Sequence, residues 1–325
     1  MRAIVQDRYG TADVLRLAQI DRPQVGAADV LIRVHAASLN IGDWHMMAGL
    51  PYLARVTGLR RPGSPVRGMD VAGRVERVGV DVSLFRPGDE VFGVGAGTLA
   101  EFVIAKPDKI APKPDRLSFE QAAAVPTSAV TALQAVAPVR AAGVGERVLV
   151  IGASGAVGGY AVQLAHAFGA HVTGVASAAK LDYVRTLGAD VLVDYARGDI
   201  TRSGERYDLV VDTAGNRPVL SLRRLLAPRG TLVIVGGEGG GRVTGGFGRS
   251  LRAAALSPFV PQKLTGLAAV VRQDDLVTLA GLLESGAITP VIDAVYPLAD
   301  AATAMRRLTD GSTRGKLVVT VEPGD

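Results

Sequence analysis

The chain has 325 residues, of which 36 are basic and 31 acidic, so its formal net charge is 36 − 31 = +5. It has no cysteine, which excludes disulfide bonds, thiolate nucleophiles, iron–sulfur clusters and cysteine-ligated zinc. The arginines are scattered, so we expect a solvated basic surface or an anionic ligand rather than a nucleic-acid partner. No pattern typical of a secretory signal or a membrane span is seen, and we therefore expect a cytoplasmic protein with no membrane partner.

Short strand patterns dominate residues 1–122. Their alternation is brief and turns are frequent, which predicts a β-rich, barrel-like domain. The expected strands are Val30–Val34, Val71–Val80 and Glu90–Phe92. Ser118 and Gln121 then form the pattern of a capping box, which predicts a helix through Ala124, and a second helix is expected over Thr127–Ala137.

Strands alternate with helices in residues 123–272. The expected strands are Arg147–Ile151, His171–Val175, Val191–Asp194, Leu209–Asp212 and Thr231–Val235, and the expected helices are Gly158–Phe168, Ala179–Leu187 and Arg217–Leu226. This rhythm is typical of the doubly wound parallel sheet of a Rossmann domain, so the predicted fold class is α/β. Residues 273–325 end in a predicted strand, Lys316–Val321, which we expect to return to the N-terminal β-rich domain.

A glycine-rich loop follows the first strand of this series. Gly152, Gly155 and Gly158 are spaced as G-x-x-G-x-x-G, a variant of the dinucleotide-binding fingerprint. Such glycines allow a tight turn, close approach of the backbone to a pyrophosphate, and close packing of helix and strand. Because the phosphates bind at the N-terminus of the following helix, the predicted contacts also include Ser154, Ala156 and Val157.

The end of the second strand favours NADPH over NADH. A site for NAD has Asp or Glu here to bond the ribose 2′-hydroxyl, whereas this chain has Ser177 and Lys180, which both suit a 2′-phosphate. Tyr195, after the third strand, is expected to close the same pocket. The alternative interpretation is that Ser177 is a helix N-cap and Lys180 a solvated lysine.

Further cofactor contacts are predicted beyond the carboxyl ends of strands, where ligands of such sheets bind, and at one residue of a predicted helix. They are Thr131, Ala214, Gly236 and Gly237. Thr131 either approaches the nicotinamide or caps its helix. The glycine-rich segment 236–248 is either a lid over the nicotinamide or a plain surface loop.

Several motifs, taken together, resemble those of the medium-chain dehydrogenase/reductase superfamily, in its zinc-independent quinone oxidoreductase-like branch. The resemblance covers essentially the whole chain. It rests on Ala36–Asp43, Gly68–Val75, Pro87–Asp89, Ala122–Pro126, Gly188–Asp190 and Arg314–Val318. It implies a GroES-like β domain, a Rossmann domain inserted before the C-terminal tail, and a homodimer.

The same resemblance argues against a metal. The zinc-dependent branch has a catalytic cysteine where this chain has Asn40 and a zinc-binding histidine where it has Met69. Asp43, His45 and Asp70 remain as a chemically acceptable but less favoured ligand set. We expect no metal, and we expect Asp70 to accept local hydrogen bonds.

Four residues are the candidates for catalysis. The resemblance implies that Asn40 holds the substrate or the nicotinamide ribose, the alternative being a turn residue. Asp43 either braces this loop through backbone contacts or acts as a general base. Tyr52 and His45 are candidate proton donors, and a structural role is the alternative for His45. The segment 53–65, with Arg55, Arg60 and Arg61, is expected to wall the pocket and would suit a phosphate-bearing substrate.

Without a metal, the chemistry that remains easy is hydride transfer from NADPH to the activated C=C bond of an enone, quinone or enoyl substrate. This is the predicted function. The alternatives are a zinc-free NADP-dependent alcohol or carbonyl dehydrogenase, and a non-catalytic NADPH-binding protein.

Overall fold

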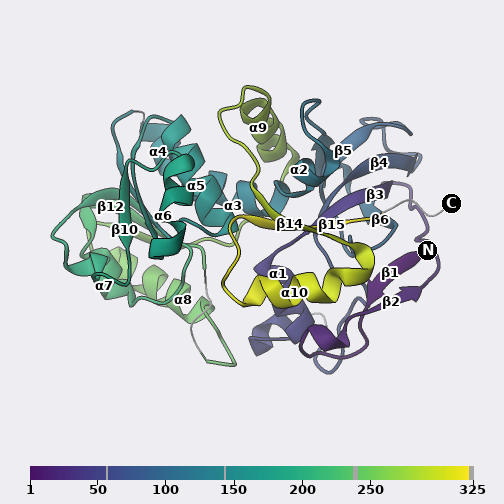
Figure 1. Ribbon diagram of the computed structural model, residues 1–325, viewed down its shortest axis with the longest axis horizontal. Coiled ribbons are helices and arrows are strands. Elements are labelled where there is room, and N and C mark those ends of the chain that lie inside the picture. The colour runs from purple at the N-terminus through teal and green to yellow at the C-terminus, as the bar shows by residue number, and fades with distance from the viewer. Residues whose placement is uncertain (56–57, 143, 237–240, 322–325) are drawn as a thin grey trace. The chain divides into compact units, whose positions relative to one another are not determined.

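The computed structural model describes residues 1–325 except 56–57, 143, 237–240 and 322–325. The chain forms two compact units, which are coloured by residue number in Figure 1. Unit 1 comprises Met1–Val130 and Val271–Asp325, and unit 2 comprises Thr131–Val270. The boundaries predicted from the sequence lie after residues 122 and 272. Helix α3 (Pro126–Ala135) runs through the first boundary, and its first turn hydrogen-bonds to Asp70 of unit 1.

Unit 1 is built on a seven-stranded sheet. Its main path is β14-β15-β3-β4-β5-β7, with β6 also paired to β3, and β1 and β2 form a separate two-stranded sheet. The strands are β1 (Arg2–Val5), β2 (Arg16–Gln19), β3 (Val30–Leu39), β4 (Asp70–Val78), β5 (Glu90–Val94), β6 (Phe102–Ala105), β7 (Ile110–Pro112), β14 (Ile292–Pro297) and β15 (Lys316–Thr320). The helices are α1 (Ile41–Ala48), α2 (Phe119–Ala123), α9 (Gln273–Glu284) and α10 (Ala301–Thr309).

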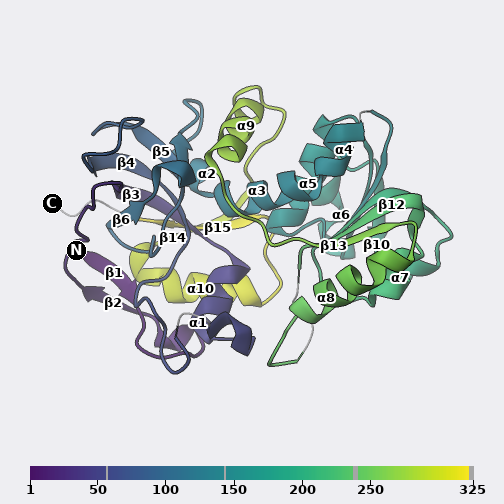
Figure 2. The same ribbon diagram turned by 180° about the vertical axis from the view of Figure 1, so that it is seen from behind.

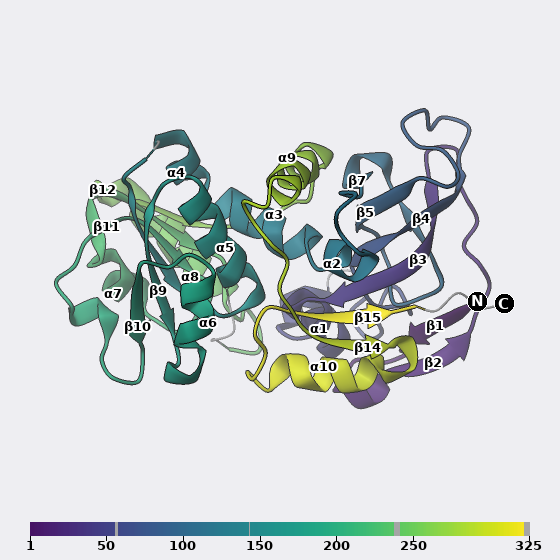
Figure 3. The same cartoon turned by 45° about the horizontal axis from the view of Figure 1, so that its top comes forward.

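The C-terminal strand returns to the N-terminal sheet, as the sequence predicts. Strand β15 pairs with β3 in antiparallel fashion, with Leu317 opposite Leu39, and Figure 3 shows the two strands adjacent. Ser38 lies opposite Asp70 across the β3–β4 pair. The ends of three strands that are distant in sequence therefore meet at the point where α1 begins.

Unit 2 contains a six-stranded parallel sheet in the order β10-β9-β8-β11-β12-β13. Numbered within the unit, this is the 3-2-1-4-5-6 order of a Rossmann fold. Helices α5 and α6 cover one face and α7 and α8 the other (Figure 2). The elements are α4 (Ala137–Ala142), β8 (Arg147–Ile151), α5 (Ala156–Ala167), β9 (His171–Ala176), α6 (Leu181–Thr186), β10 (Val191–Asp194), β11 (Tyr207–Asp212), α7 (Val219–Arg223), β12 (Leu226–Ile234), α8 (Phe247–Leu256) and β13 (Lys263–Gly266).

Three differences from the sequence-based elements have local causes. The predicted helix Arg217–Leu226 is wrong at its end, because Leu226 pairs with Tyr207 and begins β12. The predicted helix Thr127–Ala137 corresponds to α3, which ends at Ala135, and a separate short helix, α4, begins at Ala137. Helix α1 was not predicted, since eight residues are too few to show a clear apolar period.

No helix within the described residues is both long and apolar enough to cross a membrane.

Candidate active site and nucleotide-binding loop

The glycine-rich loop of unit 2 needs glycine at two of its three positions for steric reasons. Gly152 has φ +85°, in the left-handed region that favours glycine. A Cβ on Gly158 would lie 2.1 Å from the carbonyl oxygen of Gly152, so the first turn of α5 packs directly on the loop. Gly155 is different, because a Cβ there would meet its nearest atom at an ordinary 3.5 Å.

The beginning of α5 fits a phosphate. Gly155 is the N-cap residue and has no side chain to bond the first N–H groups of the helix. Ala156 and Val157 are the first two helical residues, and the N–H groups of a first turn have no acceptor within their own helix. A pyrophosphate would accept these N–H groups and benefit from the helix dipole. The loop therefore fits the dinucleotide that its sequence predicts, with Ser154 buried at its centre.

Thr213, directly after β11, braces this loop and was not predicted from the sequence. Thr213 donates its hydroxyl proton to the carbonyl of Ile151 at 2.8 Å, and it also contacts the carbonyl of Gly152. The fully buried Asp212 forms an ion pair with Arg249 of α8. This pair ties α8 to the carboxyl end of the sheet, beside the point where the strand order reverses between β8 and β11.

The residues predicted to recognise a 2′-phosphate follow β9 and β10, which are neighbouring strands of the sheet. Ser177 directly follows the strand at the N-cap of a short turn over Ala178–Lys180, yet its hydroxyl makes no capping hydrogen bond. The N–H of Tyr195 donates to the carbonyl of Ala176 at 3.2 Å, so Tyr195 lies beside the same strand end. Asp194, on the neighbouring strand, accepts the N–H of Ala196 at 3.0 Å.

The other predicted cofactor contacts lie in α3, directly after Thr213, and in the segment after β12. Thr131 lies in α3 and is 8 % exposed. Ala214 follows Thr213, and a Cβ on Gly236 would lie 2.0 Å from the carbonyl oxygen of Thr213. Gly236 therefore packs against Thr213, the same residue that contacts the glycine-rich loop. Gly237 lies outside the described residues, and so do the three residues after it, which leaves the proposed lid untested.

Unit 1 holds a buried polar cluster, which we call the Lys316 cluster. It consists of Ser38, Asn40, Asp43, Asp70, Thr127, Ser128 and Lys316. The Lys316 ammonium donates to Asn40 Oδ1 at 2.6 Å, to Asp70 Oδ2 at 3.2 Å and to Ser128 Oγ at 3.2 Å. Lys316 is 1 % exposed and Asp70 0 %, so the ion pair is shielded from water.

Asp70 is the acceptor that binds the cluster together. Its Oδ2 accepts the Ser38 hydroxyl and the Asn40 amide, both at 2.9 Å. Its Oδ1 accepts the N–H and the hydroxyl of Thr127 at the start of α3. Asp70 therefore accepts hydrogen bonds as expected, but these partners are at least 30 residues away along the chain, so the expectation that its bonds are local is wrong.

The Asn40 amide is engaged at both ends. Its oxygen accepts from Lys316 and from the Ser128 hydroxyl, and its nitrogen donates to Asp70 and, at 3.4 Å, to Asp43. These bonds fix the side chain at the N-cap of α1. They give Asn40 a positioning role, while its predicted contact with the substrate or the ribose stays a prediction.

Asp43 braces the start of α1. Its Oδ2 accepts the backbone N–H of Asn40 at 2.9 Å, which is the backbone contact expected from the sequence. Burial, with a smaller contribution from the charge of Asp70, raises the pKa of Asp43 to about 7. A carboxyl group with such a pKa changes charge near neutrality.

The raised pKa predicts a pH-dependent stability. Between the ordinary pKa near 4 and about 7, the folded protein binds the Asp43 proton more tightly than the unfolded chain, so stability falls as the pH rises. Asp43→Asn keeps the acceptor for Asn40 and removes the charge. We expect the free energy of unfolding of this variant, relative to that of wild type, to be about 2 kcal/mol higher at pH 8 than at pH 5. Urea unfolding at both pH values measures it, and a pH-independent difference would contradict the assignment.

The two predicted proton donors have different surroundings. His45 Nδ1 donates to the carbonyl of Leu50 at 2.6 Å, which leaves Nε2 as the atom able to carry a transferable proton. Tyr52 is 45 % exposed, with the Arg55 guanidinium 4.8 Å from its ring centre. The alternative structural role of His45 thus has direct support, and neither residue belongs to the Lys316 cluster.

Within the ranges described, no three His, Cys, Asp or Glu side chains are grouped closely enough to hold a metal ion. The alternative ligand set of Asp43, His45 and Asp70 is thus not assembled here.

Comparison with known proteins identifies the family. The zinc-binding dehydrogenase family model matches residues 187–319, and the alcohol dehydrogenase GroES-like domain matches residues 26–115. The chloroplast envelope quinone oxidoreductase homolog of Arabidopsis thaliana is 32 % identical, with 98 % of each chain covered. The NADPH-dependent alkenal/one oxidoreductase of the same plant is also 32 % identical, over 98 % of this chain and 79 % of that protein.

A solved structure agrees. The quinone oxidoreductase from Coxiella burnetii has a TM-score of 0.87 and 30 % identity, with 99 % of each chain covered. The chain belongs to the medium-chain dehydrogenase/reductase superfamily and is quinone oxidoreductase-like. It is an oxidoreductase, with unit 1 as the GroES-like domain and unit 2 as the Rossmann domain, which confirms the predicted fold class.

Proposed function

We propose that this protein is a metal-free reductase of the activated C=C bond of an enone, quinone or enoyl substrate, with NADPH as the reductant. The hydride that NADPH supplies when bound adds to the β-carbon, and the electron pair of the C=C bond moves onto the conjugated oxygen as an enolate. A proton then completes the product, which is a saturated carbonyl compound for an enone or enoyl substrate and, after tautomerisation, a hydroquinone for a quinone.

The Lys316 cluster is the observation that supports the proposal that the reaction needs no metal. Its ammonium contacts the Asn40 amide oxygen at the position where the zinc-dependent branch has a cysteine. Asp70, next to Met69, is already neutralised by that ammonium and by its other donors. Amide and ammonium groups are poor partners for zinc, which prefers thiolate, imidazole and carboxylate ligands.

The proposal of C=C reduction, rather than reduction of a simple ketone, rests on the proposed lack of a metal and on the activities named for the relatives. No metal is proposed to polarise a simple ketone, whereas a conjugated acceptor can take hydride while its charge spreads into an enolate. Relatives of similar identity are named as quinone and alkenal/one oxidoreductases. In unit 1, His45 Nε2 and the Tyr52 hydroxyl are the candidate donors of the final proton.

The preference for NADPH rests on Ser177, Lys180 and Tyr195 at the end of β9. Strand β9 ends at Ala176 and is followed by Ser177, with no acid there to accept a ribose 2′-hydroxyl, and the Ser177 hydroxyl is not used for capping. A hydroxyl and an ammonium three residues apart can both donate to a phosphate. The name of the alkenal/one oxidoreductase relative also includes NADPH.

The cofactor assignment predicts a selective loss. Ser177→Ala combined with Lys180→Ala should weaken NADPH binding at least tenfold, because charge-assisted bonds to the 2′-phosphate are removed. NADH, which has no 2′-phosphate, should bind within about twofold of wild type. Titration of both nucleotides measures the ratio, and an equal loss for the two would refute the assignment.

The reaction itself is tested by NADPH oxidation with matched substrates. We expect turnover with 2-cyclohexenone and with a benzoquinone, and little with cyclohexanone, which has the same ring without the conjugated bond. Turnover of the ketone alone would favour a carbonyl dehydrogenase. NADPH-dependent thermal stabilisation with no turnover on any substrate would favour a non-catalytic binding protein.

We also propose a cytoplasmic homodimer that takes a small-molecule substrate and no nucleic acid. The dimer follows from the resemblance alone, and size-exclusion chromatography with light scattering would test it.

A further inference from the structure

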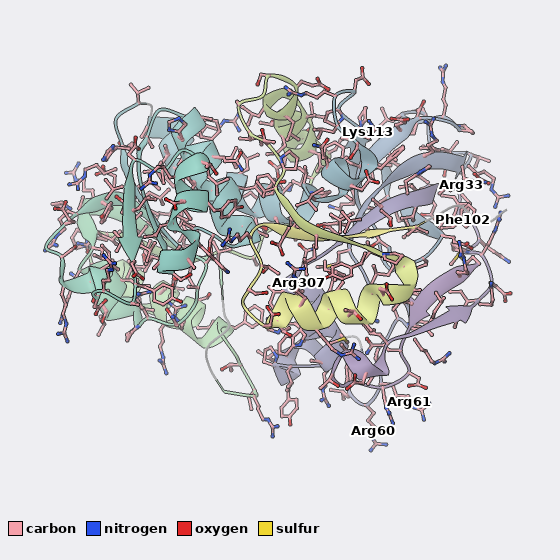
Figure 4. The ribbon with its side chains drawn as sticks, viewed as in Figure 1. Arg33, Arg60, Arg61, Phe102, Lys113 and Arg307 are labelled. Atoms are coloured by element: carbon pink, nitrogen blue, oxygen red, sulfur yellow. The ribbon has the colours of Figure 1, made fainter. Side chains whose placement is uncertain are left out.

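A basic pocket lies on unit 1, outside the Lys316 cluster and the nucleotide-binding loop. It has a volume of about 570 Å³ and is lined by Asp7, Arg8, Asp13, Val14, Arg16, Arg60 and Arg61. Arg16 begins β2 opposite Val5, and Arg8 lies just beyond the end of β1. Arg60 and Arg61 belong to a loop that is distant in sequence from these strands, and they lie at the lower edge of unit 1 in Figure 4.

The charges of this pocket are not balanced. Four arginines and two aspartates line it, so its lining carries 4 − 2 = +2. Among the described residues, none of the four arginines has a carboxylate within ion-pair distance. Asp13 is engaged by Arg306, at 2.5 Å, and by the Thr11 hydroxyl. Exposed guanidinium groups that line one pocket in excess of its carboxylates favour a bound anion.

An apolar pocket lies on the other side of the same short turn. It has a volume of about 330 Å³, and its apolar lining includes Trp44, Met47, Leu50 and Met305. Thr11 and Ala12 line the apolar pocket, whereas Asp13 and Val14 line the basic one. The turn η1 (Ala12–Val14) therefore separates them, and the Arg306–Asp13 ion pair joins their rims.

We propose that the two pockets together bind a phosphate-bearing amphiphile. Its phosphate lies among Arg8, Arg16, Arg60 and Arg61, and its apolar body lies against Trp44 and Leu50, which are both partly exposed. A phosphate monoester carries a charge of about −1.5 to −2, and its three oxygens can each accept from guanidinium groups. A carboxylate, with a single charge, would offset less of the positive charge of this lining. The site is independent of the proposed reaction.

Calorimetric titration with octyl phosphate tests the proposal, with inorganic phosphate and octanol as the two half-ligands. We expect octyl phosphate to bind at least tenfold more tightly than either. Arg60→Gln with Arg61→Gln should weaken it tenfold or more, and so should Ala48→Leu, which fills the apolar pocket. Because Arg60 and Arg61 are exposed, their replacement does not endanger folding.

The matched control is Arg77→Gln with Arg86→Gln, which removes two exposed arginines from the same unit and should change binding less than twofold. An equal loss in this control would overturn the proposal, as would equal binding of octyl phosphate and inorganic phosphate. Competition by saturating NADPH would place the phosphate in unit 2 and also overturn it. Binding to vesicles of phosphatidic acid without binding of monomeric octyl phosphate would indicate a membrane surface instead of these pockets.

Discussion

Replacing Lys316 with methionine should lower the free energy of unfolding by about 3–5 kcal/mol, because Asp70 would then be a buried charge without a counter-ion. Methionine has a similar length and keeps the apolar part of the side chain. The same change removes the donor to the Asn40 amide oxygen, so the start of α1 should lose its fixed geometry. Urea unfolding at pH 7 measures the loss.

A second variant separates the charge from the packing. Adding Asp70→Asn to Lys316→Met removes the uncompensated charge and should recover part of the lost stability. If the single variant unfolds within about 1 kcal/mol of wild type, the cluster does not act as a buried ion pair. A double variant no more stable than the single one would assign the loss to packing alone.

Replacing Gly155 with alanine should weaken NADPH binding at least tenfold while the fold is kept. Gly155 has φ −78°, which alanine adopts without strain, and its Cβ would meet no atom closer than 3.5 Å. We therefore expect the free energy of unfolding to change by no more than about 1 kcal/mol. The added methyl group would instead stand where a pyrophosphate approaches the backbone.

Gly158→Ala gives the opposite pattern. Its Cβ would lie 2.1 Å from the Gly152 carbonyl oxygen, so the loop must shift and stability should fall by about 1–3 kcal/mol. Gly198→Ala, where a Cβ meets no atom within 4 Å, serves as the control. Unfolding and NADPH titration are measured on all three variants. Undiminished NADPH binding by Gly155→Ala would contradict the place assigned to the pyrophosphate.

The Rossmann domain was readable from sequence because its signals are local. Strand β8 and the three glycines are contiguous, and the rhythm of strands and helices repeats over short distances. Strand β13 was missed, since Lys263–Gly266 has only four residues and depends on its pairing with β12. The capping box at Ser118 and Gln121 is equally local, and it is confirmed.

The Lys316 cluster could not be predicted in the same way. Asn40, Asp70 and Lys316 are separated by up to 276 residues, and they meet because β15 pairs with β3 and β3 with β4. The sequence motifs contain all three, but spacing along the chain does not indicate which of them touch. The Asp212–Arg249 pair was missed for the same reason, because α8 folds back onto the end of β11.

The Lys316 cluster shows what the chain has at one position where related zinc enzymes have a cysteine. At Asn40, where related zinc enzymes have a thiolate, the chain places an amide held by a buried ammonium. Within the cluster, the Lys316 ammonium balances the charge of Asp70. This is the basis for proposing a reaction that leaves its charge on a conjugated oxygen.

The most direct test follows the hydride itself. The protein would be incubated with 2-cyclohexenone and NADPH carrying deuterium at the transferred position of C4, and the product would be examined by mass spectrometry and NMR. We predict cyclohexanone with one deuterium at the former β-carbon. An allylic alcohol with deuterium at the former carbonyl carbon would contradict the proposed reaction and identify a carbonyl reductase.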